Sequence, residues 1–190
     1  MNYQERYKKA RIDVLAELDK ALSSIDTESL ERLEKDILDA DQVFFVAVGR
    51  VMLSCQSVCK RLAHLGIKAH YVGEITEPAI TKNDLLIVVS GSGQSLFPLG
   101  IAKTARETVD CRIVHVGSNA ESDMKPIADY MVRIPVRTKF YRKDEIDSCQ
   151  IMTSLFEQSV LLLGDILAKM IVEEKGLDMK SLWKFHANLE

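Results

Sequence analysis

The stretch Leu85–Ser95, LLIVVSGSGQS, decides the fold of this chain. Its five consecutive apolar residues predict a strand that is buried on both faces, which is typical of a parallel sheet. Serine and glycine follow directly, and a helical pattern comes after them. Glycine lets a backbone approach a ligand closely, and the hydroxyls of Ser90, Ser92 and Ser95 can each donate a hydrogen bond. The stretch therefore predicts a buried strand leading into a phosphate cradle at a helix N-terminus.

A simpler interpretation is a tight turn in which Ser95 only caps the helix that follows. Two other kinds of phosphate-binding loop are excluded by their motifs. A Walker-type loop needs Gly-Lys-Ser/Thr, and a dinucleotide-binding loop reads Gly-x-Gly-x-x-Gly after the first strand, whereas this loop follows the third. The residues alone leave the phosphate cradle and the plain turn open.

Alternation of strand and helix extends outward from this stretch in both directions. Each expected strand is short and apolar, and the connections are too short to hold a second domain. Five such strands predict an α/β protein, a three-layer αβα sandwich with a five-stranded parallel sheet. The expected strands cover 42–49, 68–73, 84–90, 111–117 and 129–136, with helices at 52–65 and 96–108 between them.

Further helices flank the predicted sheet at both ends. Two amphipathic helices are expected at 3–22 and 28–40, the second capped by Asp26 or Thr27. A charged loop at 137–148 then leads to a long helix at 148–175 and a short one at 179–185. We treat 1–190 as a single domain, with N-terminal helices at 1–40, the sheet core at 42–135 and C-terminal helices at 148–190.

The long C-terminal helix is apolar around nearly its whole circumference between Leu155 and Val172. Such a helix has to be covered on more than one side. A partner subunit is the cover we expect, which predicts a homo-oligomer. Charged residues near its middle, such as Asp165 and Lys169, are seldom found in a membrane-spanning helix, so no membrane contact is expected.

The composition of the 190 residues excludes several classes of function. Hydrophobic residues make up 47% and charged residues 28%, an ordinary globular balance, and the formal net charge of -3 gives no general attraction to nucleic acid. The charged N-terminus lacks the apolar region of a signal peptide. The cysteines contain no C-x-x-C pair, which predicts buried, reduced thiols, no metal site and a cytoplasmic protein. These cysteines are Cys55, Cys59, Cys111 and Cys149.

The motifs together resemble the sugar isomerase (SIS) domain, a flavodoxin-like fold of phosphosugar-binding proteins. In that family the loop usually reads Ser-x-Ser-Gly-Glu-Ser/Thr, and here it reads SGSGQS at 90–95. The chain is similar more narrowly to the 6-phospho-3-hexuloisomerase group, in order and over nearly its whole length. The other matching stretches are RLAHLGIKAHYVGE at 61–74, DEI at 144–146, TSLFE at 153–157 and HANLE at 186–190.

The resemblance implies a phosphosugar isomerase that needs no cofactor and no metal. Its most specific implied reaction converts 3-hexulose 6-phosphate to fructose 6-phosphate through an enediol. Ser90, Ser92 and Ser95 are implied to bind the phosphate, and Gly49 and Arg50 to contact the phosphate or the sugar. The family assembles as dimers or tetramers.

Two further residues are implied to carry the chemistry. Glu157 stands where the group has its proposed catalytic base, and a carboxylate sheltered on an apolar helix suits proton transfer between adjacent carbons. His186 matches a tail histidine that assists ring opening or proton transfer in the site of a neighbouring subunit. The alternatives are a buried carboxylate paired with a basic residue of another helix for Glu157, and a solvated tail residue for His186.

Two positions depart from the family pattern and change the expected pocket. Val51 follows Arg50 where the family usually has serine, and Gln94 replaces the usual glutamate. Another ketose or aldose phosphate therefore stays open as the substrate, and so does a non-catalytic sugar-phosphate sensor. Sensors of that type usually carry a fused DNA-binding domain, for which we expect no room in this chain. A flavin or nucleotide binder would need aromatic residues in the two loops, and neither loop has one.

Overall fold

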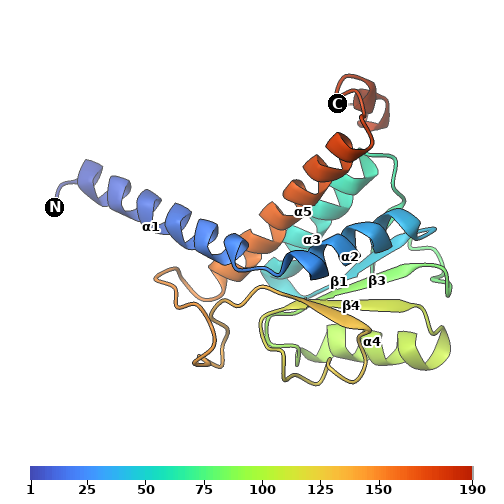
Figure 1. The fold of residues 1–190 in the computed structure, drawn as a ribbon, viewed down its shortest axis with the longest axis horizontal. Coiled ribbons are helices and arrows are strands. Elements are labelled where there is room, and N and C mark those ends of the chain that lie inside the picture. Colours follow the sequence, from blue (N-terminus) through green and yellow to red (C-terminus); the bar gives the residue numbers. More distant parts are fainter. Residues whose placement is uncertain (190) are drawn as a thin grey trace.

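Residues 1–189, which the computed structural model describes, form a five-stranded parallel sheet with helices on both faces (Figure 1). The strand order is β2-β1-β3-β4-β5, and every neighbouring pair is parallel. The predicted αβα sandwich is confirmed. The strands are β1 (Val43–Val46), β2 (Ala69–Tyr71), β3 (Leu85–Val89), β4 (Arg112–Gly117) and β5 (Tyr130–Arg133).

Strand alternation divides the core into two apolar layers, one on each face of the sheet. In β1, Val43 and Phe45 belong to the layer under α1, α2, α3 and α5, whereas Phe44 and Val46 face α4. Within residues 1–189, none of the helices has the length and apolar character needed to cross a membrane. The helices are α1 (Tyr3–Ser23), α2 (Thr27–Asp39), α3 (Gly49–Ala63), α4 (Leu96–Thr108) and α5 (Ser154–Glu174), with a 3₁₀-helix at Ser181–Phe185.

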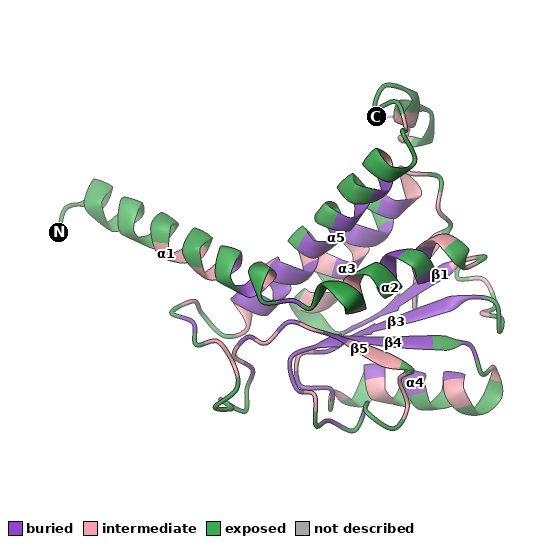
Figure 2. Ribbon diagram, in the orientation of Figure 1, coloured by how far each residue is buried: buried purple, intermediate pink, exposed green. Residues whose placement is uncertain are grey.

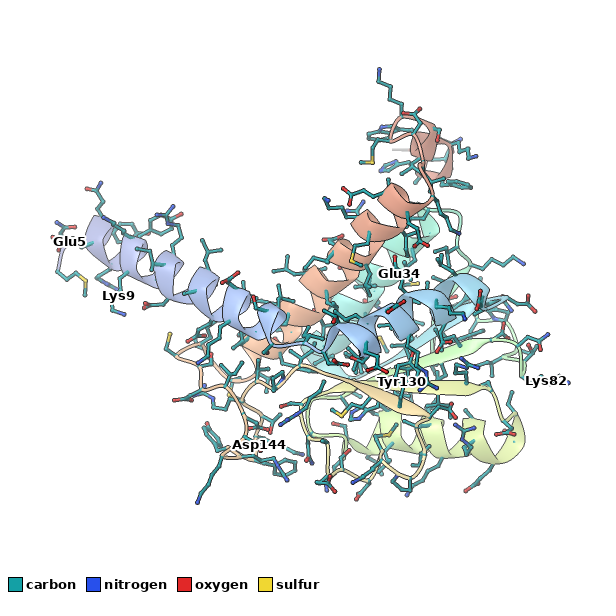
Figure 3. All side chains as sticks on the ribbon, viewed as in Figure 1. Glu5, Lys9, Glu34, Lys82, Tyr130 and Asp144 are labelled. Carbon is teal, nitrogen blue, oxygen red and sulfur yellow. The ribbon has the colours of Figure 1, made fainter. Side chains whose placement is uncertain are left out.

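Helix α1 begins in solvent and ends in the core. Its first turns project from the body and are exposed (Figures 1 and 2), and the side chains of Glu5 and Lys9 stand well away from the other elements (Figure 3). Leu18 and Ala21, in its last turns, are buried in the apolar layer that also holds α5. Among the described residues, α1 therefore packs against the rest of the chain through its C-terminal half.

Helices α3 and α5 lie side by side and run in the same direction. Arg50 and Glu157 meet at their N-terminal ends, and Arg61 and Asp165 meet two to three turns further along. Close approach between them depends on Gly164, because a Cβ atom there would lie 2.3 Å from Cγ2 of Val58. The packing brings the first turns of both helices to the same edge of the sheet.

Two helix starts differ from the sequence prediction. Helix α3 begins at Gly49 and not at residue 52, so Arg50 lies in its first turn. Helix α5 begins at Ser154 and not at residue 148, because Met152 adopts a left-handed conformation (φ 55°) that a helix cannot contain. Glu157 is consequently a first-turn residue. Cys149, which lies before α5, is exposed. The prediction that all four thiols are buried is therefore wrong for Cys149.

Candidate functional site

The site lies at the switch point of the sheet, where the chain connections leave β1 and β3 in opposite directions. β1 and β3 are hydrogen-bonded neighbours, with Val46 opposite Val88, so their carboxyl ends lie together. Gly49 and Arg50 follow β1, and the serine loop at 90–95 follows β3. Ligands of open parallel sheets bind in such a crevice, and the two predicted loops meet there.

The serine loop brings two of its three hydroxyls together. Ser90 and Ser92 are buried, and the Ser90 hydroxyl donates to the Ser95 hydroxyl over 3.4 Å. Ser95 is the N-cap residue of α4, yet its side chain makes no capping hydrogen bond. The Ser92 hydroxyl accepts a hydrogen bond from the N–H of Gln94 at 3.3 Å. Because Ser95 faces Ser90 and does not cap its own helix, the plain-turn interpretation loses its main support.

A buried histidine supports the serine loop from beneath. His115 of β4 is 2% exposed, and its Nε2 lies 2.9 Å from the carbonyl oxygen of Ser90. Burial lowers the pKa of His115, so the ring is neutral and its Nε2–H donates to that carbonyl. Gly93 has a left-handed φ of 64°, and a Cβ atom there would lie 2.2 Å from Oγ of Ser122. The Asn119 side chain adds a hydrogen bond to the Ser92 carbonyl at 3.2 Å.

Glu157 and Arg50 form the second half of the site. Glu157 is 7% exposed, and its two carboxylate oxygens have different partners. Arg50 Nη1 donates to Oε2 at 2.5 Å, and Thr153 Oγ1 donates to Oε1 at 2.8 Å. The same nitrogen of Arg50 also donates to Ser154 Oγ at 3.0 Å. The paired-carboxylate alternative is thus met in form, but the partner is the arginine predicted to bind the ligand.

The serine loop lies close to the first turn of α5. A Cβ atom on Gly91 of the serine loop would lie 3.5 Å from the ring of Phe156, the residue before Glu157. It would lie equally close to the Thr138 methyl group. Thr138 is held by Glu145 of the charged loop, which accepts hydrogen bonds from its N–H and its hydroxyl at 2.9 and 2.7 Å. Hydroxyls, a helix N-terminus, an arginine and a sheltered carboxylate therefore lie at the same edge of the sheet, where ligands of open parallel sheets bind.

Comparison with known proteins places the chain in a family. It is 35% identical over 178 residues to a 3-hexulose-6-phosphate isomerase of Bacillus subtilis (strain 168), covering 94% of this chain and 96% of that protein. A 3-hexulose-6-phosphate isomerase of Mycobacterium gastri is 33% identical, with 88% and 83% covered. The chain belongs to the 3-hexulose-6-phosphate isomerase family. It is therefore a phosphosugar isomerase.

Structural comparison agrees with this family of isomerases. A crystal structure from Methanococcus jannaschii, for which a molecular function of 3-hexulose-6-phosphate isomerase was inferred, superposes with a TM-score of 0.80 at 28% identity. It covers 96% of this chain and 99% of that one. No model of a protein family matches the sequence.

The remaining predicted site residue of this isomerase, His186, lies elsewhere. Its ring stacks on His64 at a centroid distance of 5.2 Å and lies 5.0 Å from the ring of Trp183. His64 follows α3, so it is separated from Arg50 by the length of that helix, about 20 Å at 1.5 Å per residue. Within one chain, His186 and Glu157 are not brought together.

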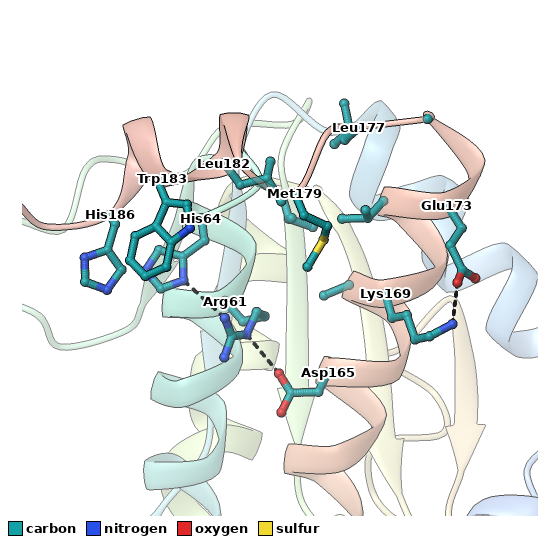
Figure 4. Close-up of a pocket in the computed structure, with 14 residues that line it drawn as sticks. Arg61, His64, Asp165, Lys169, Glu173, Leu177, Met179, Leu182, Trp183 and His186 are labelled. Carbon is teal, nitrogen blue, oxygen red and sulfur yellow. Dashed lines mark hydrogen bonds and ion pairs between the residues drawn. The ribbon is translucent and has the colours of Figure 1, made fainter.

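His186 instead lines an open hollow at the opposite edge of the sheet, which we call the tail hollow (Figure 4). The tail hollow has a volume of about 970 Å³ and an apolar lining, with the Arg61–Asp165 pair at one side. It lies between the C-terminal halves of α3 and α5 and the 3₁₀-helix. Its other labelled lining residues are His64, Lys169, Glu173, Leu177, Met179, Leu182 and Trp183.

Some residues of the site were not predicted from the sequence. The predicted helix at 148–175 includes Thr153 and Ser154 within its length, whereas the structure has them at its start. The polar residues directly before the apolar run are a helix-start signal that could have moved the boundary. His115 and Asn119 carry no local signal, because they reach the serine loop from β4 and the turn after it. Within residues 1–189, no three His, Cys, Asp or Glu side chains are placed to hold a metal ion.

Proposed function

We propose that this isomerase converts 3-hexulose 6-phosphate to fructose 6-phosphate in the crevice between the serine loop and the first turn of α5. The observation that carries the proposal is the pairing of Glu157 with Arg50 beside a loop of hydroxyls. That arrangement puts a proton acceptor, a positive charge and an anion cradle within one crevice. Named relatives of the chain act on 3-hexulose 6-phosphate, which supports the choice of substrate.

The serine loop would hold the phosphate group. Ser90, Ser92 and Ser95 offer hydroxyl donors, and the first turn of α4 offers backbone N–H groups that have no partner inside the helix. The positive end of the α4 dipole favours an anion at the same place. Gly49 and Arg50 lie across the crevice, where the guanidinium can reach the phosphate or a sugar oxygen.

Glu157 would move the proton. In the proposed reaction the carboxylate removes the proton from C2 of the open-chain sugar, and the C3 carbonyl becomes an enediolate oxygen. The proton of the C2 hydroxyl then passes to the C3 oxygen, which becomes the C3 hydroxyl. Glu157 returns a proton to carbon C3, C2 becomes the ketone, and no atom is gained or lost. Arg50 and Thr153 fix the carboxylate but leave lone pairs for the proton, and Arg50 can stabilise the enediolate.

A second subunit would supply His186. Leu162, Ile166 and Met170 are 37–40% exposed and recur every four residues along the outer face of α5. This apolar stripe supports a homodimer or a tetramer in which α5 is covered. His186 of one subunit would then assist ring opening or proton transfer in the site of the other. The buried thiols of Cys55, Cys59 and Cys111 fit a reducing compartment, and we place the protein in the cytoplasm.

The test is turnover in deuterium oxide. Purified protein is incubated with 3-hexulose 6-phosphate, and the product is examined by NMR. Fructose 6-phosphate carrying deuterium on C3 is the expected result, because a carboxylate that takes a proton from C2 exchanges part of it with solvent. Binding of sugar phosphates without product and without hydrogen exchange would mean a sensor, and product from a different ketose phosphate alone would change the substrate.

A further inference from the structure

The turn that precedes α5 is built to place the first residues of that helix. It covers residues 148–153, between the charged loop and Ser154. Met152 in this turn has φ of 55°, an unfavourable left-handed conformation for a residue with a side chain. Such a conformation persists only when surrounding contacts hold it in place. The contacts that hold this turn therefore decide where Thr153 and Glu157 lie.

The main contact comes from Glu17, in the C-terminal half of α1. One carboxylate oxygen accepts hydrogen bonds from the Ser148 hydroxyl at 2.6 Å and the Gln150 side-chain amide at 3.0 Å. The other oxygen accepts from the backbone N–H of Cys149 at 2.7 Å. Three consecutive residues of the turn thus donate to one side chain that is more than 130 residues away in the sequence.

The hydrogen bonds favour the ionised form of this carboxylate. Burial on its own raises the pKa of Glu17, but donors from Ser148, Cys149 and Gln150 outweigh it and bring the pKa to about 2. Glu17 is therefore charged at neutral pH and accepts from all its donors. On the other side of the turn, Arg137 Nη2 donates to the Gln150 carbonyl at 3.0 Å, so the segment is held from two elements.

We propose that Glu17 is a positioning residue for Glu157, acting through residues 148–153 and the Thr153 hydroxyl. The path is continuous. Glu17 fixes residues 148–150, Met152 completes the turn, and Thr153 donates to Oε1 of Glu157. This inference rests on the proposed function, in which Glu157 moves the proton. It also gives the attached half of α1 a role in the reaction, although α1 contributes no residue to the crevice.

The first measurement tests, without using activity, whether Glu17 holds residues 148–153 in place. We call these contacts the latch. Glu17→Gln keeps the size of the side chain but replaces one acceptor oxygen with an NH₂ group that faces donors. The matched control is Asp19→Asn, which removes one negative charge from an exposed position on the same helix. Amide hydrogen exchange of residues 148–157 should become about tenfold faster in Glu17→Gln, because hydrogen bonds to a charged group are lost, and should stay unchanged in Asp19→Asn.

The second measurement tests the consequence for catalysis. In Glu17→Gln we expect kcat to fall about tenfold while KM changes little, because small misplacement of a reacting group reduces rate more than phosphate binding. Combination with Thr153→Ala should be non-additive, since both changes release the same carboxylate. Combination with Ser92→Ala should be additive. If Glu17→Gln does not fold, Glu17→Asp, which keeps the charge with a shorter reach, is measured instead.

The outcomes separate this inference from the proposed function. Unchanged hydrogen exchange at 148–157, or a folded Glu17 variant with wild-type kcat, overturns the positioning role while the isomerase reaction stands. Equal losses in kcat and in substrate binding, or additivity with Thr153→Ala, overturn it as well. Faster exchange in Glu17→Gln together with an inactive wild type would leave the latch in place and remove the proposed reaction.

Discussion

Helix α5 is joined to α3 by two ion pairs of the same kind in two different environments. Near the N-terminal end, Arg50 meets Glu157, whose side chain is 9% exposed and has a second donor in Thr153. Near the middle of α5, Arg61 meets Asp165 at 3.0 Å, and the aspartate side chain is 46% exposed. The first pair is hydrogen-bonded to the hydroxyls of Thr153 and Ser154, and the second borders the apolar tail hollow.

This difference distinguishes a group of converging polar side chains from an apolar hollow. Sheltered polar groups that converge can bind an anion and move a proton, and such groups lie at the carboxyl edge of the sheet. An open apolar hollow with solvated charges at its border has volume but no convergent chemistry. We therefore propose that the reaction takes place among these polar groups, and that the tail hollow and the α5 stripe are surface for a partner subunit.

The sharpest test of the comparison is Glu157→Gln. The change keeps the shape of the side chain and one acceptor oxygen for Arg50, but it removes the base and the negative charge. We expect kcat to fall about 10²- to 10⁴-fold, the usual loss for a positioned general base. Affinity for sugar phosphate, measured by calorimetry, should change little because the serine loop is intact. A variant that keeps near wild-type kcat would show that another group moves the proton.

His186 tests whether the C-terminal tail of one subunit reaches the Glu157 site of another. We expect His186→Gln to lower kcat about 10²-fold, at the small end of the range for acid–base groups. Mixed oligomers of Glu157→Gln and His186→Gln subunits are the decisive measurement. If His186 acts in the neighbouring site, mixing restores one intact site and a substantial part of the activity.

Without such restoration, His186 does not act across the interface, and the tail belongs to the structure of its own chain. Light scattering of the wild type in the same buffer is the control. A monomer at micromolar concentration would contradict both the mixing experiment and the partner assigned to the α5 stripe.

Ser92→Ala is expected to have the opposite kinetic signature from Glu157→Gln. Loss of one hydroxyl donor to a phosphate should raise KM about tenfold, because a hydrogen bond to a charged group contributes about 1.5–3 kcal/mol. kcat at saturation should change less, since the base is untouched. Inhibition by inorganic phosphate provides an independent measure. Unchanged KM and phosphate affinity would place the anion outside the serine loop.

Much of the fold could be predicted from local pattern. The apolar runs of β3 and β4 and the helix at Leu96–Thr108 stand out because buried parallel strands and amphipathic helices have strong periodic signals. The start of α5 was misplaced by six residues because the cause is not local. The turn at 148–153 is held by Glu17, a contact between distant parts of the chain that no window of sequence contains.

The site shows the same division. The serine loop and Arg50 could be located because residues after buried parallel strands gather at one edge of the sheet. The stretch TSLFE at 153–157 indicates Glu157 as a candidate base through its resemblance to the isomerase group. The pairing of Glu157 with Arg50, and the support of the loop by His115, depend on the register between elements and appear only in the folded chain.

The smallest effects are expected in stability, where we compare Glu17, which holds the turn before α5, with Asp165 near the middle of that helix. The pKa of Glu17 is about 2 in the folded chain against an ordinary 4.5, so its ionised form is favoured by folding. Its stabilisation is therefore complete above about pH 4.5 and is lost as the pH falls towards 2.

We expect Glu17→Gln to lower the free energy of unfolding at neutral pH by about 1 kcal/mol, allowing for solvent around the carboxylate. That deficit should shrink in urea titrations carried out at decreasing pH. Asp165→Asn should cost less than about 1 kcal/mol, as exposed ion pairs do. A Glu17→Gln deficit that stays constant down to pH 3 would show that the side chain acts through its shape, and the charged latch would have to be abandoned.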